Sequence, residues 1–279
     1  MRIFSASATA RRTRTNLFSC CSALALTALG CSGAAASAPA GAGGAPSGLP
    51  SAGAAGVAGT AGASNVPRPP TPGCRAPAGV SSSPQSIAET VTLINSLPKP
   101  LTLPCFLESL ARPLEMHATF SIISAQPAVG ARSPRVFLFI GPNTMSVALD
   151  GVGNLLLEFG EVRADYRSLK GEITFPLTAN ISPTAPFENV MFNDQLTTCG
   201  LCHAAEIQES ALSGVRAFVS ESLRPAPSDQ VFASALSHEL AICNPAAEPY
   251  RCAMLDGLMG WGTMNDHQFP AGMATFGQQ

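Results

Sequence analysis

The sequence predicts a mainly β fold, an antiparallel sandwich or barrel-like sheet, with a small α-helical segment toward the C-terminus. Two observations carry this prediction. From residue 114 onward, apolar and polar residues alternate with the period of two that is typical of half-buried strands. Turn signals such as Gly141-Pro142-Asn143 and Asp150-Gly151 separate these short stretches. The order of elements has no βαβ rhythm, so a parallel α/β sheet is not expected.

The N-terminal residues 1–30 have the pattern of a secretory signal peptide. They contain four arginines and no acidic residue, and an apolar run extends from Leu17 to Gly30. A basic start followed by a short apolar run is typical of an export signal rather than of a membrane span. The protein is therefore expected to be exported, to the periplasm or to the outer membrane.

The end of the apolar run, Ala28-Leu29-Gly30-Cys31, resembles the lipobox of bacterial lipoproteins. This resemblance implies that Cys31 is lipidated and becomes the N-terminus of the mature protein, which its lipid then holds at the membrane. Ala28 stands where lipoproteins usually have Leu. The alternative is an ordinary secreted protein that is cleaved further on, near residues 35–38.

Residues 31–73 form the predicted linker between the lipid anchor and the folded part. After Cys31 the linker is almost entirely Ala, Gly, Ser and Pro, so it buries too little apolar surface to offset its ordering entropy and is expected to be disordered. The folded part is predicted to comprise a β-rich domain at 74–190 and a C-terminal segment at 191–279. Loss of the four signal-peptide arginines changes the formal charge from −2 to −6, which argues against nucleic acid as a partner.

Two helices are expected before the first strand. The stretch from Ser86 to Glu89 has the pattern of a capping box, and apolar residues follow at helical spacing until Pro98. A second short helix is expected over residues 104–111. The stretches that predict strands are 114–122, 135–140, 145–149, 155–159 and 171–177.

Ionisable side chains within and after these strands are interpreted as solvated. His117 falls on the polar face of the first strand, while Glu158, Glu161 and Asp165 cluster loosely near a turn. No spacing fixes two of these carboxylates side by side, so we expect exposed charges rather than an acid–base pair.

The pattern weakens beyond residue 186. Residues 187–192 are expected to form one more strand, and residues 215–223 are compatible with a strand or with a helix. Apolar spacing predicts helices over 227–242 and 249–260.

The cysteines fit an oxidising compartment. Two of the nine leave with the signal peptide and Cys31 is the lipidation candidate, so an even number remains. Free thiols are unusual outside the cell, and the simplest pairing predicts two disulfides and a third pair closed by haem or by a disulfide. These pairs are Cys74–Cys105, Cys243–Cys252 and Cys199 with Cys202.

The most specific motif is Cys199-Gly200-Leu201-Cys202-His203. Two thiols at this spacing, followed directly by histidine, can hold a haem covalently, because each sulfur adds to a vinyl group and the imidazole ligates the iron. The motif resembles that of c-type cytochromes. The resemblance implies haem c as cofactor, with thioether bonds at Cys199 and Cys202 and His203 as an axial ligand.

A second axial ligand is also implied by this resemblance. In c-type cytochromes it is often a methionine in a Met-x-x-Phe-Gly loop, and Met273-Ala274-Thr275-Phe276-Gly277 matches that loop. The rival candidates for this ligand position are Met254, Met259, Met264 and His238.

Two other interpretations of the CxxCH motif stay open. The first is a disulfide between Cys199 and Cys202, with His203 at the surface. The second is a zinc site made of the same three residues and one later cysteine. The sequence also contains His238-Glu239, the beginning of a zincin motif, but Ile242 stands where the second histidine is required.

The expected function is therefore one-electron transfer at the cell envelope by a lipid-tethered, c-type cytochrome-like protein that meets a redox partner protein. The alternative is a non-enzymatic, disulfide-stapled envelope lipoprotein with a binding or structural role and no haem. The sequence lacks the GxSxG and P-loop motifs of common enzyme classes, so an electron carrier or a binding protein is expected rather than an enzyme.

Overall fold

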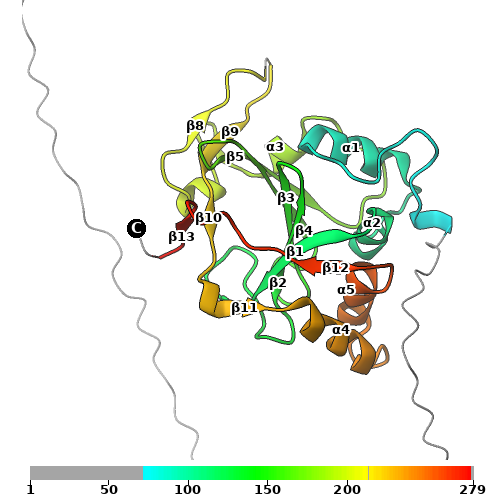
Figure 1. Ribbon diagram of the computed structural model, residues 1–279. Helices are drawn as coiled ribbons and strands as arrows, with labels where there is room; N and C mark the ends of the chain where they lie inside the picture. Colours follow the sequence, from blue (N-terminus) through cyan, green and yellow to red (C-terminus); the bar gives the residue numbers. More distant parts are fainter. Residues whose placement is uncertain (1–71, 213, 278–279) are drawn as a thin grey trace, which may run out of the picture. The chain divides into compact units, whose positions relative to one another are not determined.

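The structure, a computed structural model, describes residues 72–212 and 214–277 (Figure 1). The predicted signal peptide, the lipidation candidate Cys31 and nearly all of the predicted linker lie outside the described residues. Within these residues the prediction of a mainly β fold with few helices is confirmed, because a nine-stranded mixed sheet forms the centre of the fold.

The strands of the central sheet follow the order β11-β1-β2-β3-β4-β5-β9-β8, and β12 pairs with β1. Neighbouring strands are antiparallel except for β1 and β12, which run parallel. The strands are β1 (Leu114–Thr119), β2 (Arg135–Ile140), β3 (Asn143–Ala148), β4 (Leu156–Val162), β5 (Arg167–Thr174), β8 (Ile207–Gln208), β9 (Phe218–Glu221), β11 (Gln230–Val231) and β12 (Met264–Asp266).

Two small strand pairs accompany this sheet. β6 (Met191–Asn193) is antiparallel to β7 (Leu196–Thr197), and β10 (Leu223–Arg224) is parallel to β13 (Ala274–Thr275). In Figure 1 the end of the chain, coloured red, therefore runs past β1 as β12 and reaches β10 as β13. This path brings the C-terminal segment onto the central sheet.

Five α-helices are present in the described residues, with short 3-10 turns between some elements. The helices are α1 (Ile87–Ser96), α2 (Leu103–Ser109), α3 (Ala185–Asn189), α4 (Ala233–Ile242) and α5 (Pro249–Met259). The 3-10 turns are η1 (Pro72–Cys74), η2 (Cys199–Leu201) and η3 (Pro227–Asp229). As the capping-box pattern predicts, the Glu89 amide donates to Ser86 Oγ at the start of α1.

The structure corrects two of the expected elements. Residues 187–192 are not one strand, because α3 takes the first half of this stretch and β6 begins only at Met191. Pro186 lies in the first turn of α3, where proline favours a helix start. The helix expected from residue 227 begins only at Ala233, because Gln230 and Val231 pair with β1 instead. The open choice at 215–223 is resolved as a strand, β9.

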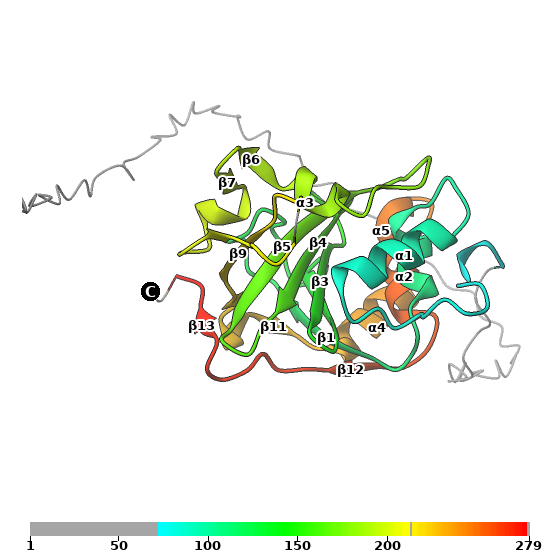
Figure 2. The ribbon, with the colours of Figure 1, turned by 90° about the horizontal axis from the view of Figure 1, so that it is seen from above.

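The strand alternation divides the central sheet into two different faces. Met116, Leu138, Met145 and Leu157 point to one face and join a single hydrophobic cluster with residues of α1, α2 and α5. Figure 2 shows these three helices on one side of the sheet and β13 on the other. The same cluster contains residues from both sides of residue 190, so the C-terminal segment contributes to the core of the β-rich part.

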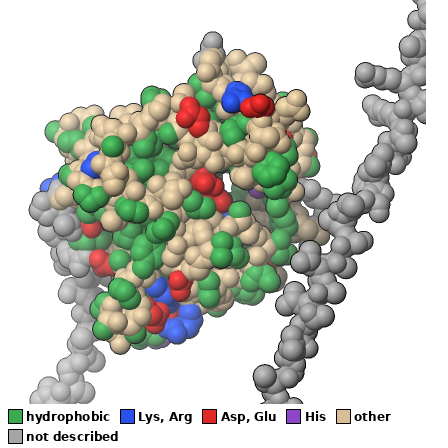
Figure 3. All heavy atoms as spheres, turned by 180° about the vertical axis from the view of Figure 1, so that it is seen from behind, with side chains coloured by type: hydrophobic (Ala, Val, Ile, Leu, Met, Phe, Trp, Pro, Cys, Tyr) green, Lys and Arg blue, Asp and Glu red, His purple; other side chains and the backbone are tan. Residues whose placement is uncertain are grey.

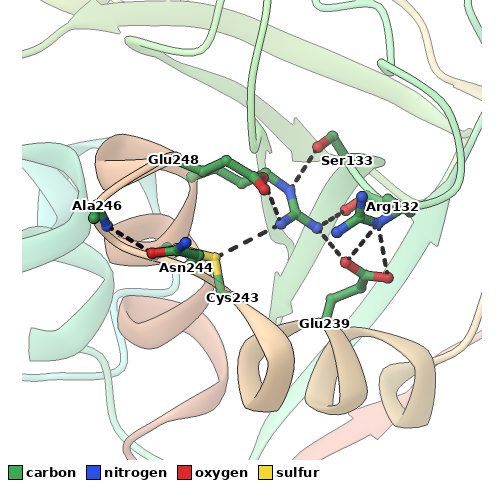
Figure 4. Close-up of a disulfide and its surroundings, with 9 residues drawn as sticks. Arg132, Ser133, Glu239, Cys243, Asn244, Ala246 and Glu248 are labelled. Atoms are coloured by element: carbon green, nitrogen blue, oxygen red, sulfur yellow. Dashed lines mark hydrogen bonds and ion pairs between the residues drawn. A yellow bond between two sulfur atoms is a disulfide. The ribbon is translucent and has the colours of Figure 1, made fainter.

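Both expected disulfides are present. Cys74–Cys105 links η1 to α2, and Cys243–Cys252 links the end of α4 to α5. Next to the second disulfide, the buried Arg251 forms ion pairs with the carboxylates of Glu239 and Glu248. Figure 4 shows how these two carboxylates lie near Cys243. These contacts join the two helices into one unit.

Candidate functional site

The second face of the sheet is unusually polar for a covered surface. Charged residues make up only 12% of the chain, and on the face seen in Figure 3 Lys and Arg occur only in small groups. Nevertheless, Arg135 of β2, Glu158 of β4, and Lys170 and Glu172 of β5 all line cavities on this face. Buried ionisable groups that converge on a cavity are typical of functional sites.

This face contradicts the interpretation of two ionisable residues as solvated. Glu158 lies within β4 and pairs with Arg135, and both side chains are less than one-fifth exposed. His117 is only 2% exposed, because Phe269 of the C-terminal segment packs on its ring. The alternation assigns His117 correctly to the non-core face, whereas Glu158, expected near a turn, lies within β4 on the same face. Neither pattern reveals which segments cover that face.

Two adjoining cavities lie on the polar face. The larger has an empty volume of about 1020 Å³, part of it open to solvent, and the smaller has about 560 Å³. Arg135, Phe137, Glu158, Cys199 and His203 line both cavities. Cavities that combine apolar walls with a few converging polar groups are typical of sites that hold small molecules and cofactors.

The CxxCH segment forms one wall of these cavities. η2 turns the chain so that the amides of Cys202 and His203 both donate to the Cys199 carbonyl, at 3.1 and 2.8 Å. The tight turn brings both thiols and the imidazole to the larger cavity. Glu206 holds β7, which ends two residues before Cys199, by accepting hydrogen bonds from the amide and the hydroxyl of Thr197.

His203 has the arrangement of a metal-ligating histidine. Its Nδ1 lies 2.7 Å from the carbonyl oxygen of Glu221, so Nδ1–H donates to that oxygen and Nε2 keeps its lone pair. Burial lowers the pKa of His203 to about 3, and the positive charges of Lys170 and Arg135 act in the same direction. The imidazole is therefore neutral at physiological pH, the form that ligates metals.

Cys199 and Cys202 are unpaired in the structure. Cys202 is exposed, whereas Cys199 is half-buried. Burial raises the pKa of the Cys199 thiol to about 11, although the neighbouring Lys170 acts in the opposite direction. The Cys199 sulfur is thus a protonated thiol beside the cavity, and the two sulfurs are not consumed by a bond to each other.

The structure brings Met273 close to this segment. Met273 is buried and lines the smaller cavity together with Cys199 and His203. None of the four rival ligands lines either cavity. They lie in the hydrophobic core (Met254, Met264), against it (Met259) or exposed on α4 (His238).

Aromatic contacts hold the segment that carries Met273. The ring of Phe269 lies 5.0 to 5.1 Å from the rings of His117, Phe137 and Phe139, and His267 lies 4.4 Å from Phe139. Rings at these distances attract one another beyond the effect of buried area. The cluster fixes residues 267–269 on the polar face, four residues before Met273. It could not be found from sequence because the rings come from three distant segments.

The charges around the cavities are only partly compensated. Arg135 pairs with Glu158, whereas burial lowers the pKa of Lys170 to about 8 despite the nearby Cys199 and Glu158. Burial, followed by the charge of Glu158, raises the pKa of Glu172 to about 7. In the sequence these charged residues stand within the strands themselves: Arg135 begins β2, Glu158 lies in β4, and Lys170 and Glu172 lie in β5.

The residues fit a covalently held haem better than a zinc ion. Two free thiols and a neutral imidazole with an available Nε2 line one cavity, which is the donor set that haem attachment requires. For zinc, a later cysteine is needed, but Cys243 and Cys252 are joined to each other. Among the described residues no group of three or more His, Cys, Asp and Glu side chains is arranged to hold a metal ion.

No protein family model, curated protein or solved structure matched the chain. Within the described ranges, no helix combines the length and the apolar character that are needed to cross a bilayer.

Proposed function

We propose that this protein is an envelope-anchored, c-type cytochrome-like lipoprotein that carries single electrons through a haem c attached to Cys199 and Cys202. The observation that carries the proposal is the common cavity of these two unpaired thiols and the neutral imidazole of His203. When bound there, haem supplies an iron that accepts and donates one electron.

The residues of the chain have separable roles in this proposal. The hydrogen bond from His203 Nδ1 to the Glu221 carbonyl orients the imidazole and leaves Nε2 for the iron. Met273, which lines the smaller cavity with Cys199 and His203, would supply the second protein ligand of the iron, and a thioether ligand raises the reduction potential relative to a second histidine. Phe137 and Phe269 cover part of the site and limit the access of water.

The cellular setting follows from the N-terminal pattern. Haem attachment to CxxCH takes place outside the cytoplasm, which agrees with the predicted signal peptide. The lipid on Cys31 would hold the protein at the membrane, and a redox partner protein would exchange electrons with it. A Cys31→Ala variant is expected to move the protein from the membrane fraction to the soluble fraction, and an unchanged membrane fraction would contradict the anchor.

Covalent haem is the property to test. The full chain, with its own N-terminus, is expressed in a bacterium that has a haem c maturation system, and its absorption spectrum is recorded before and after acid-acetone extraction. We expect a Soret band that stays with the polypeptide. A Cys199→Ser/Cys202→Ser variant should lose the covalent haem, because neither thioether bond can form.

The matched control removes two other cysteines. A Cys243→Ser/Cys252→Ser variant should keep its haem, because that disulfide lies between α4 and α5 and lines neither cavity. A colourless wild-type protein would refute the proposal and would favour the alternative, a disulfide-stapled envelope lipoprotein with a binding or structural role.

A further inference from the structure

The polar face contains two directly opposed carboxylates with different partners. Glu158 of β4 and Glu172 of β5 are cross-strand neighbours, and both line the larger cavity beside Cys199 and His203. Arg135 forms an ion pair with Glu158. Within the described residues, no ion pair or hydrogen bond engages the Glu172 carboxylate. Glu172 is therefore the acid of the pair whose charge has no local compensation.

An uncompensated acid in this position responds to nearby charge. Two neighbouring carboxylates do not both ionise freely, and the one without a cation keeps its proton to higher pH. Burial and the charge of Glu158 together raise the pKa of Glu172 to about 7, so small changes in local charge alter its protonation near neutral pH. Addition of one electron to a haem in the same cavity is such a change.

We propose that Glu172 takes up a proton when the haem in the same cavity is reduced, so that electron and proton transfer are linked. This inference rests on the proposed haem function. In the balanced step, a one-electron donor reduces ferric to ferrous iron, the Glu172 carboxylate becomes the carboxylic acid, and one proton enters from solvent. Oxidation returns the electron to an acceptor and the proton to solvent. No bond other than the O–H bond of Glu172 forms or breaks.

Other ionisable groups near Glu172 could also make the midpoint potential depend on pH. α3 packs on the opposite face of β5, where Gly171 faces Pro186, and its exposed Glu188 accepts a hydrogen bond from Thr184. On the cavity side, the ionisable groups from the surrounding elements are Glu158, Arg135, Lys170, His203, Arg224 and Asp229. Of these, Lys170 is the main competitor, because burial lowers its pKa to about 8.

The test is a potentiometric titration of the haem-loaded full chain between about pH 5 and pH 9. Since reduction raises the proton affinity of Glu172, the midpoint potential should fall as the pH rises between the pKa values of the oxidised and reduced forms. One pH unit is a tenfold change in proton concentration, so the largest slope is about 59 mV per unit for one electron. A Glu172→Gln variant should lose this slope around neutral pH.

Two further variants keep the test decisive. Glu188→Gln removes an exposed carboxylate of α3, the helix that packs on the opposite face of β5, and should leave the slope unchanged. Glu172→Asp keeps an acid and should restore a slope. In reduced-minus-oxidised infrared spectra, a protonated carboxyl band should appear in the wild type and in Glu188→Gln, and should be absent from Glu172→Gln.

The outcomes separate the two proposals. A red wild-type protein whose slope persists in Glu172→Gln, or which shows no carboxyl band on reduction, overturns the proton link and leaves the electron carrier intact. A wild-type protein without haem overturns the proposed function and the proton link together.

Discussion

Replacement of Arg251 by methionine should destabilise the fold far more than loss of a surface charge would. The Arg251 side chain is 4% exposed and donates to Ser133 Oγ at 2.8 Å, to the Arg132 carbonyl at 2.5 Å, to Glu239 at 2.6 Å and to Glu248 at 2.9 Å. Removal of one partner from a buried ion pair costs about 3–5 kcal/mol. Glu239 keeps an ion pair with Arg132, and Glu248 is partly exposed to water. We therefore expect Arg251→Met to lower the free energy of unfolding by about 3 kcal/mol, the lower end of this range.

Arg132 provides the matched control, because it binds the same carboxylate from the surface (Figure 4). Its side chain is 62% exposed, so Arg132→Met should cost less than about 1 kcal/mol. Urea unfolding with intact disulfides, followed by the fluorescence of Trp261, measures both values. The reasoning is refuted if the two variants lose similar stability or if Arg251→Met costs less than about 1 kcal/mol.

Three further predictions concern the cavity, the tail and the first disulfide. In haem-free protein the raised pKa of Glu172, about 7, means that the folded state binds its proton more tightly, so this stabilisation is lost as the pH rises through that value. Relative to Glu172→Gln, the wild type should lose up to about 1.4 kcal/mol per pH unit from about pH 4.5 to 7 in urea unfolding, and parallel stability curves would contradict this. Phe269→Ala removes three ring contacts and should lower the free energy of unfolding by about 2 kcal/mol. In the haem-loaded protein it should also weaken the spectral signature of Met273 ligation, and an unchanged spectrum would show that the aromatic cluster does not position Met273. The Cys74→Ser/Cys105→Ser variant should unfold about 3–4 kcal/mol more easily, because the disulfide closes a loop with a sequence separation of 31, and a loss below about 1 kcal/mol would argue against that entropic effect.

The local parts of the fold could be predicted from sequence because local patterns determine them. The apolar run at 135–140 gives β2 with the same bounds, and the capping box at Ser86 gives the start of α1. The disulfides followed from the even cysteine count and from sequence proximity, since Cys74 and Cys105 bracket the first helix and Cys243 and Cys252 lie on either side of the turn between two helices. Boundaries shifted where long-range pairing competes, as when β11 joined β1 and delayed the start of α4.

The functional surroundings of CxxCH could be predicted only in part. The motif identified Cys199, Cys202 and His203, and the Met-x-x-Phe-Gly pattern pointed to Met273, which the fold places at a shared cavity. The covering of the polar face depends on the pairing of β12 with β1, far apart in the sequence. Local alternation contains no information on that pairing, so the interpretation of His117 as solvated was wrong.

Peptide mass spectrometry of the mature protein tests the central claim most directly. After proteolysis of protein matured in the bacterial envelope, the peptide that spans residues 199–203 should carry the added mass of one haem, with both cysteines resistant to thiol alkylation. Recovery of this peptide without haem, either with two alkylated thiols or with Cys199 bonded to Cys202, would contradict the account.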